Sequence, residues 1–195
     1  MANKIHVLIE GYAKEIENGW LASSTTTLLE MNDKKIVVDP GCSRPKLLEA
    51  LARVGLKTAD IDYVILTHSH TDHILLDGIF ENAKVVTSAE VYDNDHQIDH
   101  EGKIPEIEIE FTRTPGHSPD SRSLIVETDE GVYAIAGDLF WWNETEEQKT
   151  DYDSLIAHPD PYAKDLALLQ NSRKKILKTA DYIIPGHGKI FKVSK

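Results

Sequence analysis

The chain has 195 residues, of which 41% are hydrophobic and 28% are charged. This balance excludes a disordered chain, and the length suits one compact domain over residues 1–195. The formal net charge of −12, with no cluster of Lys or Arg, disfavours long duplex nucleic acid as a partner.

Predicted strands and helices alternate along the whole chain, with no linker longer than a turn. In chain order, the predicted elements are strands at Ile5–Glu10, Thr25–Met31 and Lys35–Asp39, a helix at Ser43–Val54, strands at Tyr63–Thr67, Lys84–Thr87, Ile107–Thr112, Ser123–Glu127 and Val132–Ala136, a helix at Tyr162–Thr179, and strands at Tyr182–Ile184 and Ile190–Val193. Ten short strands between helices predict an α/β protein with more than one sheet.

The first residues of the chain do not resemble a signal peptide, because charges interrupt them. No run of about 18 apolar residues predicts a membrane span. Cys42 is the only cysteine, so no internal disulfide is expected. We therefore expect a cytoplasmic protein that has no membrane partner.

The segment Thr67–His73 carries the strongest chemical signal in the sequence. It places His68, His70, Asp72 and His73 directly after an apolar run at 63–66. Neutral imidazole and carboxylate are the ligands that suit zinc, iron or manganese. In a loop that leaves a strand end, the first two histidines can face one point while Asp72 and His73 face a second.

Three further candidate ligands each follow an apolar run and a glycine. His117 follows Thr-Pro-Gly at 114–116, Asp138 follows Ala-Ile-Ala-Gly at 134–137, and His187 follows Ile-Ile-Pro-Gly at 183–186. Glycine-containing turns at strand ends would let these side chains converge with the histidine-rich segment at the edge of a sheet.

These motifs, in this order, resemble the metallo-β-lactamase superfamily over residues 24–191, nearly the whole chain. The resemblance implies an α/β fold of the αββα type, with two mixed β-sheets, helices on the outer faces and a metal site at the sheet edge. It also implies two divalent metal ions, with zinc preferred over iron or manganese. One ion would be bound by His68, His70 and His117, the other by Asp72, His73 and His187, with Asp138 bridging.

The same resemblance implies roles for further residues. Asp39 would support the ligands from outside, and Asp72 would orient the nucleophile or pass a proton. The nucleophile would be a hydroxide held between the metal ions, which lower the pKa of bound water to about 7. Candidate substrate contacts are Trp141 and Trp142, which closely follow Asp138, and Lys189, which follows His187.

Several branches of the superfamily fit this sequence poorly. Flavodiiron proteins carry Glu at the position of His70, and residues 139–186 are too few for the inserted domain of the RNA-processing nucleases. The chain most resembles the small metallo-β-lactamase domain-containing hydrolases. We expect a small-molecule ester or thioester as substrate. A phosphodiesterase or ribonuclease acting on short RNA, and a mononuclear-iron enzyme like the persulfide dioxygenases, stay as alternatives.

Overall fold

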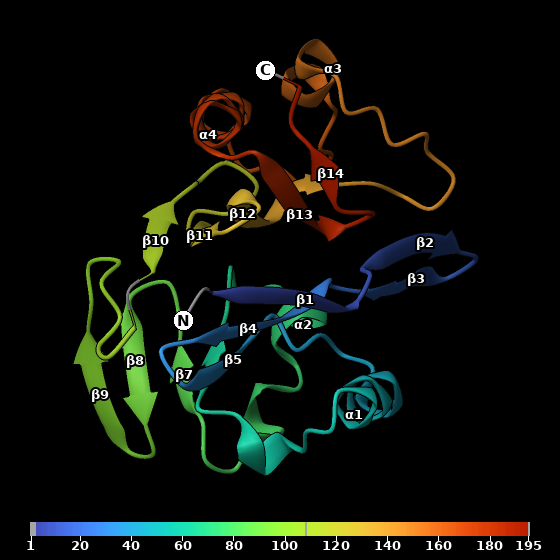
Figure 1. Cartoon of the computed structure of the whole chain (residues 1–195). Coiled ribbons are helices and arrows are strands. Elements are labelled where there is room, and N and C mark those ends of the chain that lie inside the picture. Colours follow the sequence, from blue (N-terminus) through green and yellow to red (C-terminus); the bar gives the residue numbers. More distant parts are fainter. Residues whose placement is uncertain (1–2, 108, 195) are drawn as a thin grey trace.

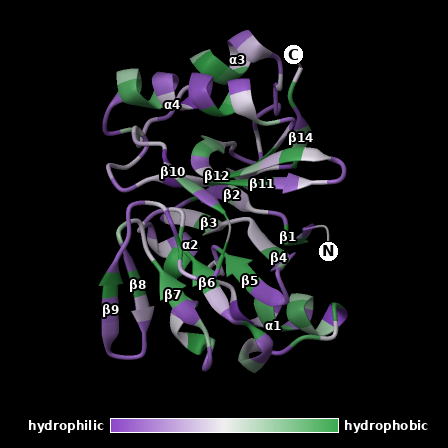
Figure 2. Cartoon of the chain, turned by 60° about the vertical axis from the view of Figure 1, so that its left-hand side comes forward, coloured by the Kyte–Doolittle hydropathy of each residue, from purple (hydrophilic) through white to green (hydrophobic). Residues whose placement is uncertain are grey.

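Two β-sheets face each other at the centre of the molecule, and helices cover their outer faces (Figure 1). The computed structural model describes residues 3–107 and 109–194. Figure 2 shows α1 (Arg44–Arg53) on one outer side, and α3 (Tyr152–Ala157) and α4 (Leu166–Thr179) on the other. The predicted fold, two sheets with helices outside them, is confirmed.

The first sheet is mixed and, within residues 3–107 and 109–194, holds seven strands. Their order across the sheet is β1 (Lys4–Ile9), β4 (Thr26–Met31), β5 (Lys34–Val38), β6 (Tyr63–Ile65), β7 (Lys84–Val86), β8 (Glu90–Asp93) and β9 (His96–Asp99). β5, β6 and β7 run parallel, whereas the other neighbours are antiparallel. Because β5 and β6 point the same way, the residues that follow them, Asp39 and Thr67 among them, emerge at the same edge.

The second sheet is also mixed and is built of five strands in the part of the chain that the structure describes. Their order is β10 (Glu110–Arg113), β11 (Arg122–Thr128), β12 (Gly131–Trp141), β13 (Tyr182–His187) and β14 (Phe191–Lys192). β12 and β13 are parallel, so the late residues of both strands lie at one edge. A separate hairpin, β2 (Tyr12–Ile16) and β3 (Gly19–Ser23), joins this sheet through a bridge between Gly11 and Gly188.

Alternation of buried side chains along the strands builds three apolar cores. On β5, Ile36 belongs to the core between the sheets, whereas its neighbour Val37 packs in the core beneath α1. On β12, Ile135 lies in the core between the sheets and Ala134 in the core beneath α4. A strand that is buried on both faces has apolar residues at successive positions, and these apolar runs are the pattern from which the strands were predicted.

The second long helix begins later than predicted. α4 starts at Leu166 rather than at Tyr162, because the Asp165 carboxylate accepts a hydrogen bond from the Leu168 N–H (2.9 Å) and caps the helix there. The first helix, predicted at Ser43–Val54, spans Arg44–Arg53. No helix in residues 3–107 and 109–194 is long and apolar enough to cross a membrane.

Several short elements differ from the prediction. The hairpin β2–β3, the strands β8 and β9, and the short helix α3 were not predicted. β10 begins at Glu110, and residue 108 of the predicted strand Ile107–Thr112 lies outside the described residues. Asp138 was expected after a turn but lies within β12, where Gly137 has a positive φ of 54° at a register shift.

Candidate metal centre

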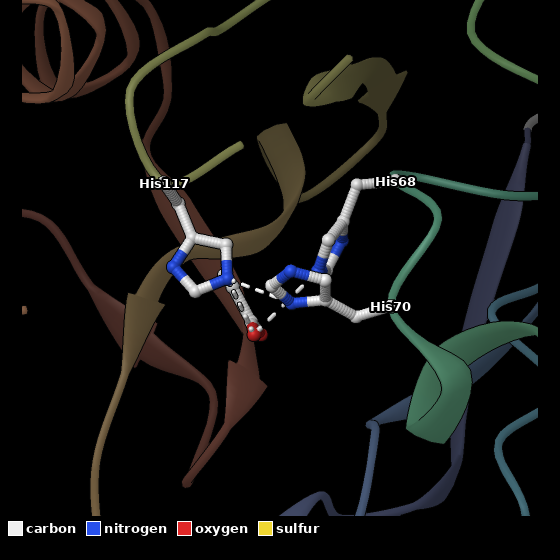
Figure 3. Close-up of side chains that lie close together, drawn as sticks. His68, His70 and His117 are labelled. Carbon is white, nitrogen blue, oxygen red and sulfur yellow. Dashed lines mark hydrogen bonds and ion pairs between the residues drawn. The ribbon is translucent and has the colours of Figure 1, made fainter. Parts of the chain in front are cut away.

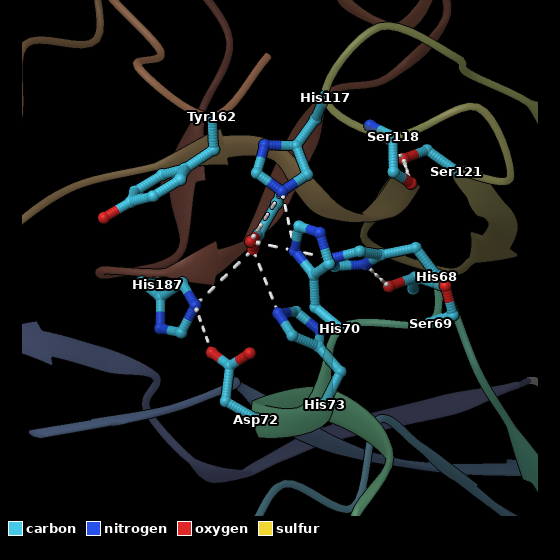
Figure 4. Close-up of polar contacts among 12 residues, drawn as sticks. His68, Ser69, His70, Asp72, His73, His117, Ser118, Ser121, Tyr162 and His187 are labelled. Atoms are coloured by element: carbon cyan, nitrogen blue, oxygen red, sulfur yellow. Dashed lines mark hydrogen bonds and ion pairs between the residues drawn. The ribbon is translucent and has the colours of Figure 1, made fainter. Parts of the chain in front are cut away.

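The seven residues predicted as metal ligands lie together where the two sheets meet (Figure 4). The first sheet contributes the segment after β6 and the short helix α2 (Thr71–Ile74), and the second sheet contributes β12, β13 and the loop before β11. The donor atoms form two groups, one of His68, His70, His117 and Asp138 and the other of Asp72, His73 and His187, each with its donor atoms within 4.8 Å of one another.

In the first group, three imidazoles point toward one another (Figure 3). His117 Nε2 lies 3.0 Å from His70 Nδ1 and 3.3 Å from Asp138 Oδ2. His68 Nε2 lies 3.6 Å from the same carboxylate oxygen. Four ligands of a tetrahedral zinc ion at about 2.0–2.1 Å are separated by roughly 3.3–3.5 Å, so these distances match such a donor set.

In the second group, His187 Nε2 lies 3.2 Å from Asp72 Oδ2. The other oxygen of Asp138, Oδ1, faces this group, at 3.1 Å from His73 Nε2 and 3.6 Å from His187 Nε2. The two carboxylate oxygens of Asp138 therefore face different groups, which is the placement expected of a bridging ligand.

Three buried polar atoms at the centre have no hydrogen-bond partner among the described residues: Nε2 of His68, Nε2 of His73 and Oδ1 of Asp138. The last two lie 3.1 Å apart and attract each other only when His73 carries a proton. Each unsatisfied buried polar group costs about 1–3 kcal/mol. A metal ion in each group would give all three atoms a partner. The residues present therefore fit the two ions that the sequence implies.

The far side of each buried ring is held by a partner outside the two groups. His73 Nδ1 lies 2.8 Å from Asp39 Oδ2, and His117 Nδ1 lies 2.8 Å from Asp160 Oδ2. His187 Nδ1 lies 3.1 Å from the backbone carbonyl of Tyr12. A ring that donates from Nδ1 keeps its Nε2 lone pair directed at the site, as metal-binding histidines require.

Asp39 holds ligands of both groups at once. Its Oδ2 accepts from the Thr67 hydroxyl (2.7 Å), which itself lies 3.1 Å from His68 Nδ1. Its Oδ1 accepts from the Thr67 N–H (2.8 Å). Through Thr67 and through its direct contact with His73, this one carboxylate orients one ring in each group, which is the place expected for a supporting residue.

The charges at the site suit cation binding. Burial lowers the pKa of His68 well below 6.5, and the neighbouring His73 lowers it further, so this ring is neutral. Burial also lowers the pKa of His73, but the carboxylates of Asp138 and Asp39 outweigh it and raise that pKa well above 6.5. A cation in this position competes with the proton on His73.

A cleft of about 570 Å³ opens onto the two groups. Of the predicted substrate contacts, Trp141 lines this cleft. Trp142 and Lys189 do not: both line a separate pocket on the other side of the hairpin, where the Lys189 backbone pairs with the Gln148 side chain. Trp142 is 4% exposed and packs edge-on against Phe191.

Asp160, Tyr162 and Trp20 are among the residues of the site that were missed in the sequence. Asp160 holds the ring of His117, and the other two line the cleft. Trp20 and Tyr162 belong to no motif, and Asp160 is separated from its partner by 43 positions. The two prolines that flank Asp160 were the one local sign of an ordered turn there.

Comparisons with known proteins agree with this geometry. The family model described as the metallo-beta-lactamase superfamily matches residues 19–107. Metallo-beta-lactamase domain-containing protein 1 of Xenopus laevis is 34% identical, over 99% of this chain and 83% of that protein. A solved structure described as a metallo-beta-lactamase from Thermotoga maritima has a TM-score of 0.70 and 21% identity, and covers 98% of this chain and 100% of its own. The dizinc quorum-quenching lactonase AidC, solved with a product, has a TM-score of 0.66 and 17% identity over 91% of this chain and 78% of its own.

Proposed function

The chain belongs to the metallo-β-lactamase superfamily and is a metal-dependent hydrolase, and on this basis we propose that two divalent ions act together at its site on an ester or thioester bond. The observation that carries the proposal is the arrangement of seven donor side chains in two groups, with one oxygen of Asp138 facing each group.

Two ions suit this donor set better than one. Seven donors exceed the four ligands of a single tetrahedral zinc ion, and the second group is complete in itself, with Asp72, His73 and His187. A mononuclear-iron enzyme would leave these three buried or half-buried donors without a metal ion. AidC, which shares the fold, is described as a dizinc enzyme. We propose zinc first, with iron and manganese as alternatives that the same ligand types accept.

Divalent ions held by the two groups of donors would activate a water molecule and polarise the carbonyl oxygen of a substrate. The protein's part is to hold the donors and to handle the proton. Asp72 lines the cleft and its side chain is 30% exposed, so it can orient the attacking water and accept its proton. Asp39 and Asp160 keep the rings of His73 and His117 fixed throughout.

Metal content and ester hydrolysis, measured on the same preparation, test the proposal. We expect about two equivalents of metal per chain, as the seven donors imply. Turnover of p-nitrophenyl acetate or an acetyl thioester should be lost with 1,10-phenanthroline and should return with zinc. Asp138→Asn should lose metal from both groups, because each carboxylate oxygen faces one of them.

The matched control for that variant is Asp151→Asn. Asp151 caps α3 at the surface, and asparagine caps a helix equally well. The control should keep wild-type metal content and turnover. A preparation that holds one iron per chain even after reconstitution, and that turns over no ester or thioester, would overturn the proposal in favour of the oxygenase alternative.

A further inference from the structure

The cleft above the metal donors has two unlike walls. One wall carries the donors, including His70, His117 and Asp138. The other is formed by apolar side chains from four separate segments: Ala13, Trp20, Ala22, Leu75, Trp141 and Tyr162. A substrate in this cleft therefore meets both the metal donors and an adjoining apolar surface.

Three of these six apolar side chains are aromatic, and we call Trp20, Trp141 and Tyr162 the aromatic wall. Trp20 comes from the hairpin strand β3, Trp141 from the end of β12 and Tyr162 from the turn before α4. Each ring contacts the other two, with centroid distances of 6.5 Å for Trp20–Trp141, 6.3 Å for Trp20–Tyr162 and 5.8 Å for Trp141–Tyr162.

The aromatic wall is both close to the metal donors and open to a ligand. Trp141 is 7% exposed and lies edge-on to the ring of His187, 6.3 Å away. Figure 4 shows the Tyr162 ring beside His117 and His187. Trp20 and Tyr162 are 41% and 44% exposed, which is much apolar area to leave in water. Exposed aromatic surface that borders a reactive site is typical of a ligand-binding surface.

Away from the metal donors, the described lining of the cleft offers no cationic side chain to a charged substrate tail. None of the described residues that line it is a lysine or an arginine, and the acidic side chains there are Asp72 and Asp138. Lys189, the cation expected near the site, lies in the separate pocket. Phosphate and carboxylate groups are recognised mainly by Lys and Arg side chains, so a charged tail on the substrate would find no partner on this wall.

We propose that the aromatic wall binds an uncharged, apolar chain of the substrate, which places the scissile ester or thioester at the metal donors. This inference rests on the proposed hydrolase function and deepens it: the substrate class becomes neutral esters or thioesters with an alkyl chain on one side of the scissile bond. Trp20 and Tyr162 are the specificity-determining residues, because their rings supply the area that a chain would cover.

Two series of esters test the proposal, one with the acyl chain lengthened from acetyl to hexanoyl and one with the alcohol lengthened from methyl to hexyl. Burial of one methylene group raises kcat/KM by up to about fourfold, so we expect one series to rise by more than about tenfold. Trp20→Ala should flatten the rising series, reducing the ratio of longest to shortest substrate by about tenfold. Two flat series would overturn the proposal.

Neighbouring positions supply matched controls. Leu21 is the next residue on the same strand, is 55% exposed and lines the separate pocket, so Leu21→Ala should leave the chain-length dependence as in the wild type. At position 162, Tyr162→Phe should keep the dependence and Tyr162→Ala should lose it, because the ring and not the hydroxyl forms the wall. Wild-type ratios in both Trp20→Ala and Tyr162→Ala would contradict the assignment.

A binding measurement separates this inference from the proposed hydrolysis. Calorimetric titration with 2-octanone and 2-butanone, which are uncharged and not hydrolysed, should give at least about tenfold tighter binding of the longer ketone to the wild type. Trp20→Ala should bind the two ketones with similar affinity. If no ester were turned over and this difference remained, the hydrolase proposal alone would fail. Equal binding of both ketones by the wild type would overturn the aromatic wall.

Discussion

At the scale of single residues, Asp160 connects His117, a candidate metal ligand, to Tyr162 in the wall of the cleft. Its side chain is fully buried, with Oδ2 2.8 Å from His117 Nδ1 and Oδ1 accepting from the Tyr162 N–H at 3.0 Å. Both carboxylate oxygens are thus committed, one to a candidate ligand and the other to the backbone that carries an aromatic ring. The position of the cleft wall is therefore set by the same residue that orients His117.

We predict that Asp160→Asn weakens metal binding by about 10–100-fold, as loss of an outer partner of a ligating histidine typically does. An amide can present an oxygen to His117 or to the Tyr162 N–H but not to both, so one of the two hydrogen bonds is lost. A zinc titration of the metal-free protein measures the effect, and excess zinc should restore part of the ester turnover.

Asp165→Asn is the control for that variant, because Asp165 caps α4 and asparagine is an equally good cap. It should bind zinc as the wild type does. Wild-type zinc affinity in Asp160→Asn would show that the ring of His117 is held by its packing rather than by this carboxylate.

The sequence predicted the residues that the structure gathers into two groups, because each lies in a short motif at the end of an apolar run. Asp39 could be predicted for the same reason. Asp160 and Trp20 could not, because their partners are distant in the sequence and no spacing rule connects them. Lys189 was expected near the site only because it follows His187, and the chain there turns the side chain toward another pocket.

At the scale of elements, Gly116 determines how closely the His117 loop approaches α4. Its φ is +141°, and a Cβ atom built there would overlap the backbone N and Cα of Leu169 in the first turn of the helix. Its carbonyl accepts from the N–H groups of Lys164 (2.8 Å) and Asp165 (3.0 Å), just before the helix begins. The loop, the helix start and the ligand are therefore positioned together.

We predict that Gly116→Ala lowers the free energy of unfolding by about 2–4 kcal/mol, since overpacking and backbone strain each cost about 1–3 kcal/mol. The control is Gly19→Ala in the hairpin, where φ is +143° but no atom lies within 4 Å of the added Cβ. Both variants carry the backbone strain of a positive φ, but only Gly116→Ala adds a steric clash. Thermal or urea unfolding measures the free energy of unfolding of each variant. Equal decreases would mean that α4 shifts to accommodate the extra methyl group.

Strands with two buried faces were predicted, whereas of the largely exposed strands only β1 was, from its apolar and β-branched residues. β5 and β6 carry continuous apolar runs at 36–38 and 63–65, because both of their faces are covered. β9 and most of the hairpin β2–β3 expose their side chains, so neither alternation nor an apolar run marks them. Trp20 lies on this hairpin, and a wall of the cleft was missed for that reason.

At the scale of the whole molecule, the site exists only when the two sheets are packed together. His68, His70, Asp72 and His73 belong to the half of the chain that forms the first sheet, whereas the remaining donors come with the second. The apolar core between the sheets holds the two sets of donors at ligand distance. Metal binding is consequently coupled to the packing of the sheets.

The overall charge of the molecule predicts how its activity responds to salt. With a formal net charge of −12 and no Lys or Arg among the described residues that line the cleft, the protein repels a polyanion over its surface, and it offers phosphates beyond the metal donors no cationic side chain. A neutral ester displaces no counterions when it binds. We therefore predict that kcat/KM for a hexanoyl ester changes by less than about twofold between low and high salt.

A short single-stranded oligonucleotide would behave differently if it were a substrate. Each phosphate contact releases counterions, so binding should fall with a log–log slope of about −0.7 per contact as salt rises. Comparing kcat/KM for the ester and for an oligonucleotide at two salt concentrations, with the metal-loaded protein, separates the two substrate classes. Efficient, salt-sensitive cleavage of the oligonucleotide beside negligible ester turnover would make the phosphodiesterase alternative correct. It would also show that the phosphates contact cationic side chains outside the cleft.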